Sequence, residues 1–578
     1  MEPAPQTQEL ADPARRSLAA QDLRGVRAYV QSGTPYVWIT AAAIAASVII
    51  VVALLLLIAA RGMPYFWPAD VVVAEYRDPA HEPVKVMAEL VDTETVSTAR
   101  LKSAGLRVDE QQLSYDRLLV KVGNRDHYGA DFRHLLSDWL VERTTPEEVL
   151  VVERMEWGNF YGVPVAVKQA GATVASGDET YAAWRPLQER ANALRERIRD
   201  IERYEIGAIN YGLERARLDE RRLALEGRTP EADPEAHAAL AQRRQQLDAG
   251  YAGLQDELAR LYGDIQRDAL VMRMITGEEV EIRLDKVARG YRPNAMGVLE
   301  KVAFYFSKLW EFAADDPREA NTEGGIFPAI FGTVLMVMIM SVIVTPFGVV
   351  AAVYLREYAR QGTMTRIIRI AVNNLAGVPS IVFGMFGLGF FVYAVGGSID
   401  RLFYPEALPA PTFGTPGILW ASLTLALLTL PVVIVATEEG LARIPRALRE
   451  ASLALGATKA ETLWRIVLPM ASPAMMTGLI LAVARAAGEV APLMLVGVVK
   501  LAPSLPLDGN IPFLHLERKF MHLGFHIYDV GFQSPNVDAA RPLVYATALL
   551  LVGVIIVLNL AAIRIRNRLR ERYKALDN

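Results

Sequence analysis

The chain has 578 residues, of which 52% are hydrophobic and 22% charged, with a net charge of −4 and a mean hydropathy of +0.20. This charge balance lacks the concentrated basic face of a nucleic-acid-binding protein, and the absence of cysteine excludes disulfides and thiolate metal sites. The composition therefore predicts apolar segments and strongly charged segments within one chain, and the length favours more than one domain.

The N-terminal part begins with a polar tail, residues 1–36, that carries four arginines. Residues 37–60 then run uncharged for 24 residues, long enough to cross a hydrocarbon core that needs about 20. A cleaved signal peptide would have a shorter apolar core nearer the start of the chain. We therefore predict a retained transmembrane anchor, with the arginines holding the tail in the cytoplasm.

Residues 65–320 contain no stretch that could span a bilayer. Short β-type runs such as 84–90 and 118–122 predict strands in the first part of this region. Residues 180–270 then show heptad-like apolar spacing on both sides of the breaker at 227–234. This spacing favours an antiparallel coiled-coil hairpin, and two separate amphipathic helices lying on the strands are the alternative. We predict an inserted α+β domain outside the membrane.

Five further apolar segments follow residue 324. They lie at about 326–354, 371–396, 417–436, 469–498 and 542–563. Basic residues collect in alternate connecting segments, whereas the loop 397–416 has only Arg401. The positive-inside rule then predicts an all-α membrane bundle of six spans with both termini in the cytoplasm. The bundle domain covers 324–565, and residues 566–578 form a basic cytoplasmic tail.

The loop between the fourth and fifth spans, residues 437–469, has the pattern of two helices joined by a tight turn. The apolar residues of its first half share one helical face: Leu441, Ile444, Leu448, Ala451 and Leu455. Gly456 suits the left-handed conformation that ends a helix. Thr458 and Glu461 match the Thr-x-x-Glu capping box that begins another. Taken alone, such a turn is common in soluble proteins and indicates no function.

The same loop resembles the EAA loop of bacterial ABC importer permeases. The matching residues are Glu450, Ala451, Ser452, Gly456, Ile466, Leu468 and Pro469, with serine in place of the second alanine. In that family this loop is the coupling helix, which sits in a cleft of the ATPase subunit. The resemblance therefore implies that these residues couple the chain to an ATPase, and that the chain resides in the bacterial inner membrane.

The chain lacks the phosphate-binding loop of an ATPase, because it contains no Gly-Lys dipeptide. ATP must therefore be hydrolysed by a separate subunit, and we expect no catalytic site, cofactor or metal site in this chain. The resemblance implies four kinds of partner. They are a homologous second permease, a dimer of ATPase subunits, an extracytoplasmic binding protein and membrane lipid.

Four stretches of the membrane domain are similar to the phosphate permeases of this family, the PstA type. They are 324–333, 345–348 with 354–358, 374–384 and 484–493. The resemblance implies that the cargo is phosphate and that the binding protein carries phosphate. The long region 65–320 is similar to an N-terminal extension of some members.

Arg485 lies within the fifth apolar span, and an arginine at the centre of a span costs about 2.5–3.5 kcal/mol on insertion scales, so it should face a cavity or a partner. Its planar guanidinium suits two oxygens of a tetrahedral oxyanion, and Glu489 is one helical turn further on. We predict that both line the substrate path; alternatively, they form a salt bridge that only masks two buried charges. Asn373 and Asn374, at the start of the third span, either line the path or cap a helix.

Three hypotheses compete with a phosphate permease. The first changes the cargo to sulfate or molybdate. The second is a membrane-tethered sensor or scaffold in which 65–320 is the functional part, but an anchor has no need of an ATPase-docking turn. The third is an ion-driven carrier, which would normally show repeated halves, and the sequence has no such duplication.

Two further segments outside the predicted spans carry histidine or aromatic patterns. His522 and His526 are four residues apart with His515 nearby, which could suggest a metal, but no carboxylate pattern accompanies them. We expect residues 500–540 to form an outward surface loop. Residues 299–312 carry lysine and aromatic residues on an amphipathic pattern, which predicts an interfacial helix just before the second span.

Overall fold

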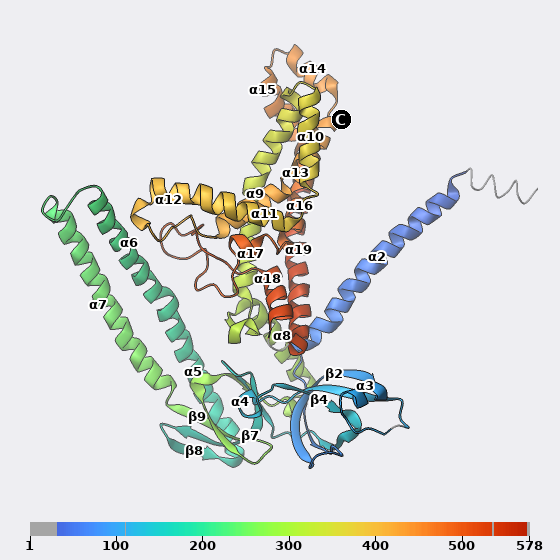
Figure 1. Cartoon of the computed structure of the whole chain (residues 1–578), viewed down its shortest axis with the longest axis vertical. Helices are drawn as coiled ribbons and strands as arrows, with labels where there is room; N and C mark the ends of the chain where they lie inside the picture. Colours follow the sequence, from blue (N-terminus) through green and yellow to red (C-terminus); the bar gives the residue numbers. More distant parts are fainter. Residues whose placement is uncertain (1–31, 110, 535–536, 575–578) are drawn as a thin grey trace, which may run out of the picture.

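The computed structural model describes residues 32–109, 111–534 and 537–574 (Figure 1). Most of the predicted N-terminal tail and the last four residues of the predicted basic tail lie outside this range. A β-rich region lies at one end of the molecule, and a helical bundle extends from it to the opposite end (Figure 1).

Six helical segments among the described residues are long and apolar enough to cross a membrane, which is the number predicted. The first is α2 (Thr34–Gly62) with η1 (Met63–Phe66), and the second is α9 (Phe327–Val353) with η8 (Tyr354–Tyr358). The third joins α11 (Ser380–Phe386), η9 (Gly387–Gly396) and α12 (Gly397–Phe403). The fourth is α13 (Ile418–Arg443). The fifth joins α15 (Lys459–Thr462), η11 (Leu463–Val467) and α16 (Leu468–Gly488), and the sixth lies in α19 (Val537–Lys574).

Two predicted span boundaries are wrong. The third span begins at Ser380 and not at residue 371, because residue 371 lies inside a separate helix, α10 (Thr363–Leu375), and Pro379 precedes α11. A residue before proline is disfavoured in the helical conformation, so Val378 interrupts the helix inside a continuous apolar run. The fifth span ends at Gly488 instead of 498, because Glu489 adopts an extended backbone and only a short helix, α17 (Leu493–Val496), follows.

Helix α13 forms the centre of the bundle, between α9 and α16. In its most apolar window 67% of the residues are buried, whereas the corresponding share for α9 and for the fifth span is 28%. Small residues permit this close packing: a Cβ added to Gly478 would lie 2.7 Å from the Ala436 side chain. Such small-residue contacts are typical of helix interfaces in membranes.

Helix α2 contacts the bundle only through its last turns. A Cβ on Gly62 would lie 2.7 Å from the backbone of Ala546 in α19. From that contact α2 diverges from the other helices (Figure 1). None of the residues in its apolar window is buried. The surface of α2 therefore remains open to lipid or to a neighbouring subunit.

The first sheet of the β-rich region has five antiparallel strands in the order β4-β3-β2-β1-β5. The strands are β1 (Val71–Tyr76), β2 (Val84–Ser97), β3 (Ser114–Lys121), β4 (Phe132–Leu136) and β5 (Leu140–Thr144). Short helices α3 (Thr98–Ser103) and α4 (Arg125–Tyr128) connect them. Strands β2 and β3 contain the two runs predicted from the sequence.

A second sheet combines strands from both sides of the long helices. Strands β6 (Leu150–Arg154), β7 (Asn159–Gln169) and β8 (Ala172–Ser176) precede the helices, and β9 (Asp268–Arg273), β10 (Glu279–Arg283) and β11 (Val287–Tyr291) follow them. The order is β10-β9-β7-β6-β11, with β8 paired to β7. The three later strands were not predicted. The long helices between β8 and β9 therefore form an excursion, that is, a helical insertion between strands of a single sheet.

The excursion consists of α5 (Thr180–Asp200), a π-helical turn at 201–205, α6 (Ile206–Leu225) and α7 (Pro234–Ile265). Near the sheet, α5 and the end of α7 pack on its core through Leu187, Leu194, Leu258 and Leu261. Beyond the sheet, α6 and α7 lie side by side and project away from it (Figure 1). The helices thus pair with each other and also rest on strands, and their supercoiling stays a prediction.

The outer part of α6 contacts loops of the membrane domain. Arg222 pairs with Glu406, and the Tyr211 hydroxyl donates to the carbonyl of Ile511. Tyr211 also meets the ring of His515 edge-on, with centroids 5.9 Å apart. Helix α8 (Val298–Ala314) connects the second sheet to α9. The excursion is therefore held at its base by the sheet and along its length by two membrane-domain loops.

Candidate functional site

The turn predicted to couple to an ATPase lies at the end of the molecule opposite the sheets, around α14 (Arg446–Ala454) and α15 (Figure 1). Gly456 has φ +85°, the left-handed conformation predicted for it. The predicted capping box is also present. Thr458 Oγ1 accepts from the amide of Glu461 at 3.2 Å, and Glu461 Oε2 accepts from the amide of Thr458 at 2.8 Å.

The predicted single apolar face of the first half is wrong, because the helix breaks at Ile444 and Pro445. The residue before a proline favours an extended backbone, and Ile444 has φ −74° and ψ 126°. Leu441 and Ile444 pack in a small core with Leu463, whereas Leu455 is 90% exposed. The break separates a buried supporting part from an exposed turn.

Ser452, the serine that replaces an alanine of the family pattern, is buried and bonds to another residue of the turn. Its Oγ lies 2.8 Å from Thr462 Oγ1, so one hydroxyl donates to the other. This bond joins the helix before Gly456 to the helix after it. The substitution thus adds a polar link across the turn.

Arg449 anchors the turn to the second span, which the sequence did not predict. Its guanidinium lies 3.0 Å from a carboxylate oxygen of Glu357 in η8 and donates to the carbonyls of Leu441 and Ile444. Lys459 donates to the Glu357 carbonyl and lies over the ring of Tyr358. Arg449 and Glu357 are 92 positions apart in the chain, so no local pattern in the sequence indicates this contact.

The surface of the turn is both apolar and open. Leu455 is 90% exposed and Trp464 is 74% exposed, and Leu453 is also exposed. Of the residues carried over from the EAA pattern, Glu450, Ala451 and Gly456 are exposed, Ser452 is buried, and Ile466, Leu468 and Pro469 are half-buried. Exposed large apolar side chains grouped at a helical turn are typical of a docking surface.

Arg485 lies in the last turn of α16, and Glu489 caps that helix. Arg485 Nε is 3.6 Å from Glu489 Oε1, which is beyond hydrogen-bond length. The two side chains are 37% and 22% exposed. Val483 and Ala487 on the opposite face are buried against the bundle, whereas Leu481, Arg485 and Gly488 form an exposed stripe. The arginine therefore points away from the core of its own chain.

Asn373 and Asn374 do not join this pair. Both lie in the last turn of α10 and are exposed. Among the described residues, neither asparagine shares a hydrogen bond with Arg485 or Glu489. They therefore belong to the helix that precedes the third span, and only the association of Arg485 with Glu489 is observed.

The prediction that 500–540 forms an outward surface loop is wrong for its histidines, which are all buried. His522 caps α18 (Leu523–Tyr528) by accepting from the amide of Gly524, and His526 lies within that helix. The cause is long-range packing: Phe520, Met521 and Leu523 join the bundle core. The described residues contain no group of three or more His, Asp or Glu arranged to hold a metal.

A family model described as "Binding-protein-dependent transport system inner membrane component" matches residues 344–574. The phosphate transport system permease protein PstA 1 of Mycobacterium tuberculosis (strain CDC 1551 / Oshkosh) is 36% identical over 246 residues, which are 42% of this chain and 71% of that protein. The chain belongs to this permease family. The match includes the coupling turn and Arg485, and the sheets and the α6–α7 pair lie outside the residues that the family model matches.

Two other proteins are similar to this permease. The phosphate transport system permease protein PstA of Mycobacterium leprae (strain TN) is 38% identical over 194 residues, which are 33% of this chain and 58% of that protein. A solved structure described as an inward facing conformation of the MetNI methionine ABC transporter is 20% identical and covers 42% of this chain and 94% of its own, with a TM-score of 0.30. The six membrane-spanning helices and the bacterial permease relatives together show that the permease is a multi-pass inner-membrane protein.

Proposed function

We propose that the permease is a subunit of an ATP-driven phosphate importer and forms half of the translocation path. The exposed turn around Gly456 is the observation that carries this proposal, because the family pattern and an open apolar surface coincide there. Similarity to proteins named as phosphate permeases favours phosphate over sulfate or molybdate. No observation favours a tethered sensor or scaffold.

The proposed assembly contains this chain, a homologous second permease, two ATPase subunits and an extracytoplasmic phosphate-binding protein. The ATPase binds the turn formed by Leu453, Leu455 and Trp464, with Glu450, Ala451 and Gly456 beside it. Helix α19 ends on the side of that turn (Figure 1), which supports a cytoplasmic C-terminus. The sheets at the opposite end are then extracytoplasmic. Co-purification with mass spectrometry of the bound subunits tests this composition.

Within the path, Arg485 is proposed to bind the phosphate. A tight ion pair would leave little of the guanidinium free for a ligand, but this arginine lies 3.6 Å from Glu489 and remains 37% exposed. It also points away from its own bundle, toward the side on which a partner permease would lie. Two oxygens of phosphate match the two-pronged guanidinium. Glu489 accepts a hydrogen bond from protonated phosphate, whereas sulfate carries no such proton at neutral pH. Asn373 and Asn374, exposed in the last turn of α10, are also proposed to line the path.

Uptake of labelled phosphate by cells tests the role of Arg485, with a membrane assay for the assembled importer. We expect Arg485→Ala to abolish most uptake without loss of assembly, and Arg485→Lys to recover part of it. Arg401→Ala is the matched control, because Arg401 is an exposed arginine that bonds only within its own helical turn. Full uptake in the double variant Arg485→Ala with Glu489→Ala would show that the arginine only neutralises the glutamate.

The extracytoplasmic region is proposed to act as a spacer or docking element for the binding protein. Its α6–α7 pair contacts membrane-domain loops through Arg222 and Tyr211. Replacing residues 206–253 with a short Gly-Ser linker removes the projecting part and keeps the segment that packs on the sheet. We expect normal insertion with altered affinity for the binding protein. Failure to insert would make the pair part of the core fold instead.

A further inference from the structure

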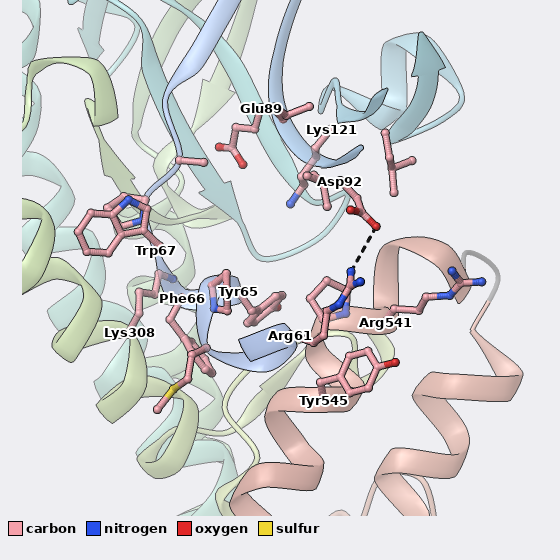
Figure 2. A pocket seen from close by; sticks show the side chains of 18 of the residues that line it. Arg61, Tyr65, Phe66, Trp67, Glu89, Asp92, Lys121, Lys308, Arg541 and Tyr545 are labelled. Carbon is pink, nitrogen blue, oxygen red and sulfur yellow. Dashed lines mark ion pairs between the residues drawn. The ribbon is translucent and has the colours of Figure 1, made fainter. Parts of the chain in front are cut away.

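A large cavity lies where the sheets meet the membrane helices (Figure 2). Its volume is about 1640 Å³, larger than the roughly 300–1,000 Å³ of an ordinary small-molecule pocket. The last turns of α2 and η1, strands β2 and β3, helix α8 and the start of α19 all contribute walls. The cavity lies far from the coupling turn and outside the path proposed around Arg485.

Three walls place this cavity at the level of the lipid headgroups. Leu57 and Arg61 come from the end of one membrane helix, and Tyr545 comes from the beginning of another. The third wall is α8, which was predicted as an interfacial helix. Its outer face carries an apolar stripe of exposed side chains: Val298, Val302, Phe306 and Trp310. Aromatic and apolar side chains on an amphipathic helix are typical of the membrane interface.

Most charged side chains that line the cavity are already paired. Lys308 and Arg318 bind Glu311, at 3.1 Å and 3.0 Å. Arg117 lies 2.6 Å from Glu94, and Arg61 lies 3.7 Å from Asp92 (Figure 2). These pairs hold the walls together.

Lys121, Glu89 and Glu323 are the exceptions. Among the described residues, the side chain of Lys121 has no ion pair or hydrogen bond, although it lies over the Phe132 ring and directly across the strand pair from Glu89. The charges of Asp131, Glu323 and Glu89 act on its ammonium group. One carboxylate oxygen of Glu89 is buried without a hydrogen-bond partner. Burial raises the pKa of Glu89 to about 7 against the opposing charge of Lys121, and burial also raises the pKa of Glu323. Figure 2 shows Glu89 and Lys121 reaching from the sheet toward Tyr65 and Arg61.

We propose that this cavity binds a zwitterionic phospholipid with an amine headgroup, such as a phosphatidylethanolamine. Lys121 binds the phosphate, joined by Arg61 in exchange for its 3.7 Å pair with Asp92, and Glu89 with Glu323 binds the ammonium group. Aromatic rings of Tyr65, Phe66, Trp67 and Tyr305 line the same space and contact the glycerol region. The acyl chains then lie along α2, in whose apolar window no residue is buried.

Charge and size favour this lipid over two related ligands. Among the cavity residues, seven are Lys or Arg and six are Asp or Glu, so a ligand with balanced charge suits the site better than an anionic lipid. A free phosphate ion shares the chemistry that Lys121 recognises. However, it would leave most of the 1640 Å³ empty and both carboxyl groups without a cation. The lipid satisfies both kinds of unpaired group.

Native mass spectrometry of the full-length chain in its assembly, titrated with a phosphatidylethanolamine in detergent, tests the proposal. We expect Lys121→Met and Glu89→Gln each to weaken binding about tenfold, the order of one lost hydrogen bond to a charged group. The matched controls are Lys85→Met, which changes an exposed residue of β2, and Glu82→Gln, which changes an exposed residue of the loop before β2; both lie outside the cavity. Both controls should bind lipid like the unmodified chain.

Two competition arms distinguish the sources of the phosphate group. A phosphatidylglycerol should bind more weakly than the phosphatidylethanolamine, because it has no ammonium for Glu89. Excess inorganic phosphate should displace neither lipid. Unchanged lipid binding in Lys121→Met would overturn the proposal, and so would displacement by inorganic phosphate. Phosphate uptake is not part of the readout, so a failure here is distinct from a failure of the proposed transport function.

Discussion

Replacing Gly456 with valine should uncouple ATP hydrolysis from transport. The residue has φ +85°, and no atom lies within 4 Å of the position that a Cβ would take. The effect of the substitution therefore comes from backbone strain alone, without a steric clash inside the chain. A non-glycine residue in the left-handed conformation costs about 1–2 kcal/mol, which shifts an equilibrium about 5- to 30-fold. A β-branched side chain lies at the upper end of this range.

The assay is ATP hydrolysis and uptake of labelled phosphate in proteoliposomes that contain the assembled importer. For Gly456→Val we expect the amount of phosphate taken up per ATP hydrolysed to fall by up to about 30-fold while the subunits still assemble. Gly456→Asn should retain most of the coupling, because asparagine tolerates the left-handed region. Gly362→Val is the control, since Gly362 also has open space around its Cβ but an extended φ of −157°.

Two outcomes would refute this reasoning. Normal coupling in the valine variant would show that the turn does not need a left-handed residue in order to dock. Equal impairment of the valine and asparagine variants would show that any side chain obstructs the partner at this position, so that backbone strain is not the cause. A loss of coupling in Gly362→Val would point to a general sensitivity of the cytoplasmic loops.

Three further changes probe the fold. Ser452→Ala leaves the buried hydroxyl of Thr462 without its partner, so we expect faster hydrogen exchange in the turn and a loss of roughly 1–3 kcal/mol. Gly478→Leu places a side chain against Ala436, whose Cβ lies 2.7 Å from the position of an added Cβ. This overpacking should cost about 1–3 kcal/mol of stability and lower the melting temperature. An unchanged melting temperature would contradict the close packing. The pKa of Glu89 rises from 4.5 to about 7 on folding, so the unmodified chain loses stability as the pH rises through that interval. Lipid-free Glu89→Gln should therefore melt higher than the unmodified chain above pH 7 and equally below pH 4.5, as measured by thermal denaturation, and equal melting at every pH would contradict the shift.

Local signals in the sequence predicted much of this molecule. Six apolar runs predicted six membrane helices, and the left-handed Gly456 and the Thr458 capping box followed from short-range residue preferences. The ends of two spans were missed, because Pro379 and the extended Glu489 interrupt helices inside runs that remain apolar. Apolar length indicates that a segment enters a membrane but not where its helix breaks.

Long-range contacts account for the other differences. Strands β9 and β11 are short and pair with β7 and β6, which precede the long helices, so nothing in their own pattern marks the partner. Strand β10 pairs only with β9 and joins the sheet through it. The contact of Arg449 with Glu357 and the burial of His522 likewise depend on packing between distant segments. The site at Arg485 was found because a charge in an apolar helix is visible in the sequence, whereas its exposure became clear only in the fold.

The contact of α6 with the membrane-domain loops gives that helix the geometry of a lever. Its 20 residues span about 30 Å, and Arg222 lies near the end distant from the sheet. With that arm length, a rotation of about 10° at the base displaces the end by about 5 Å, more than the reach of an ion pair. A binding protein seated on the sheets could thus break or restore the link to Glu406 by a small tilt. In the proposed topology, a spectroscopic label on α6 would then report, from the extracytoplasmic side, when these loops are released.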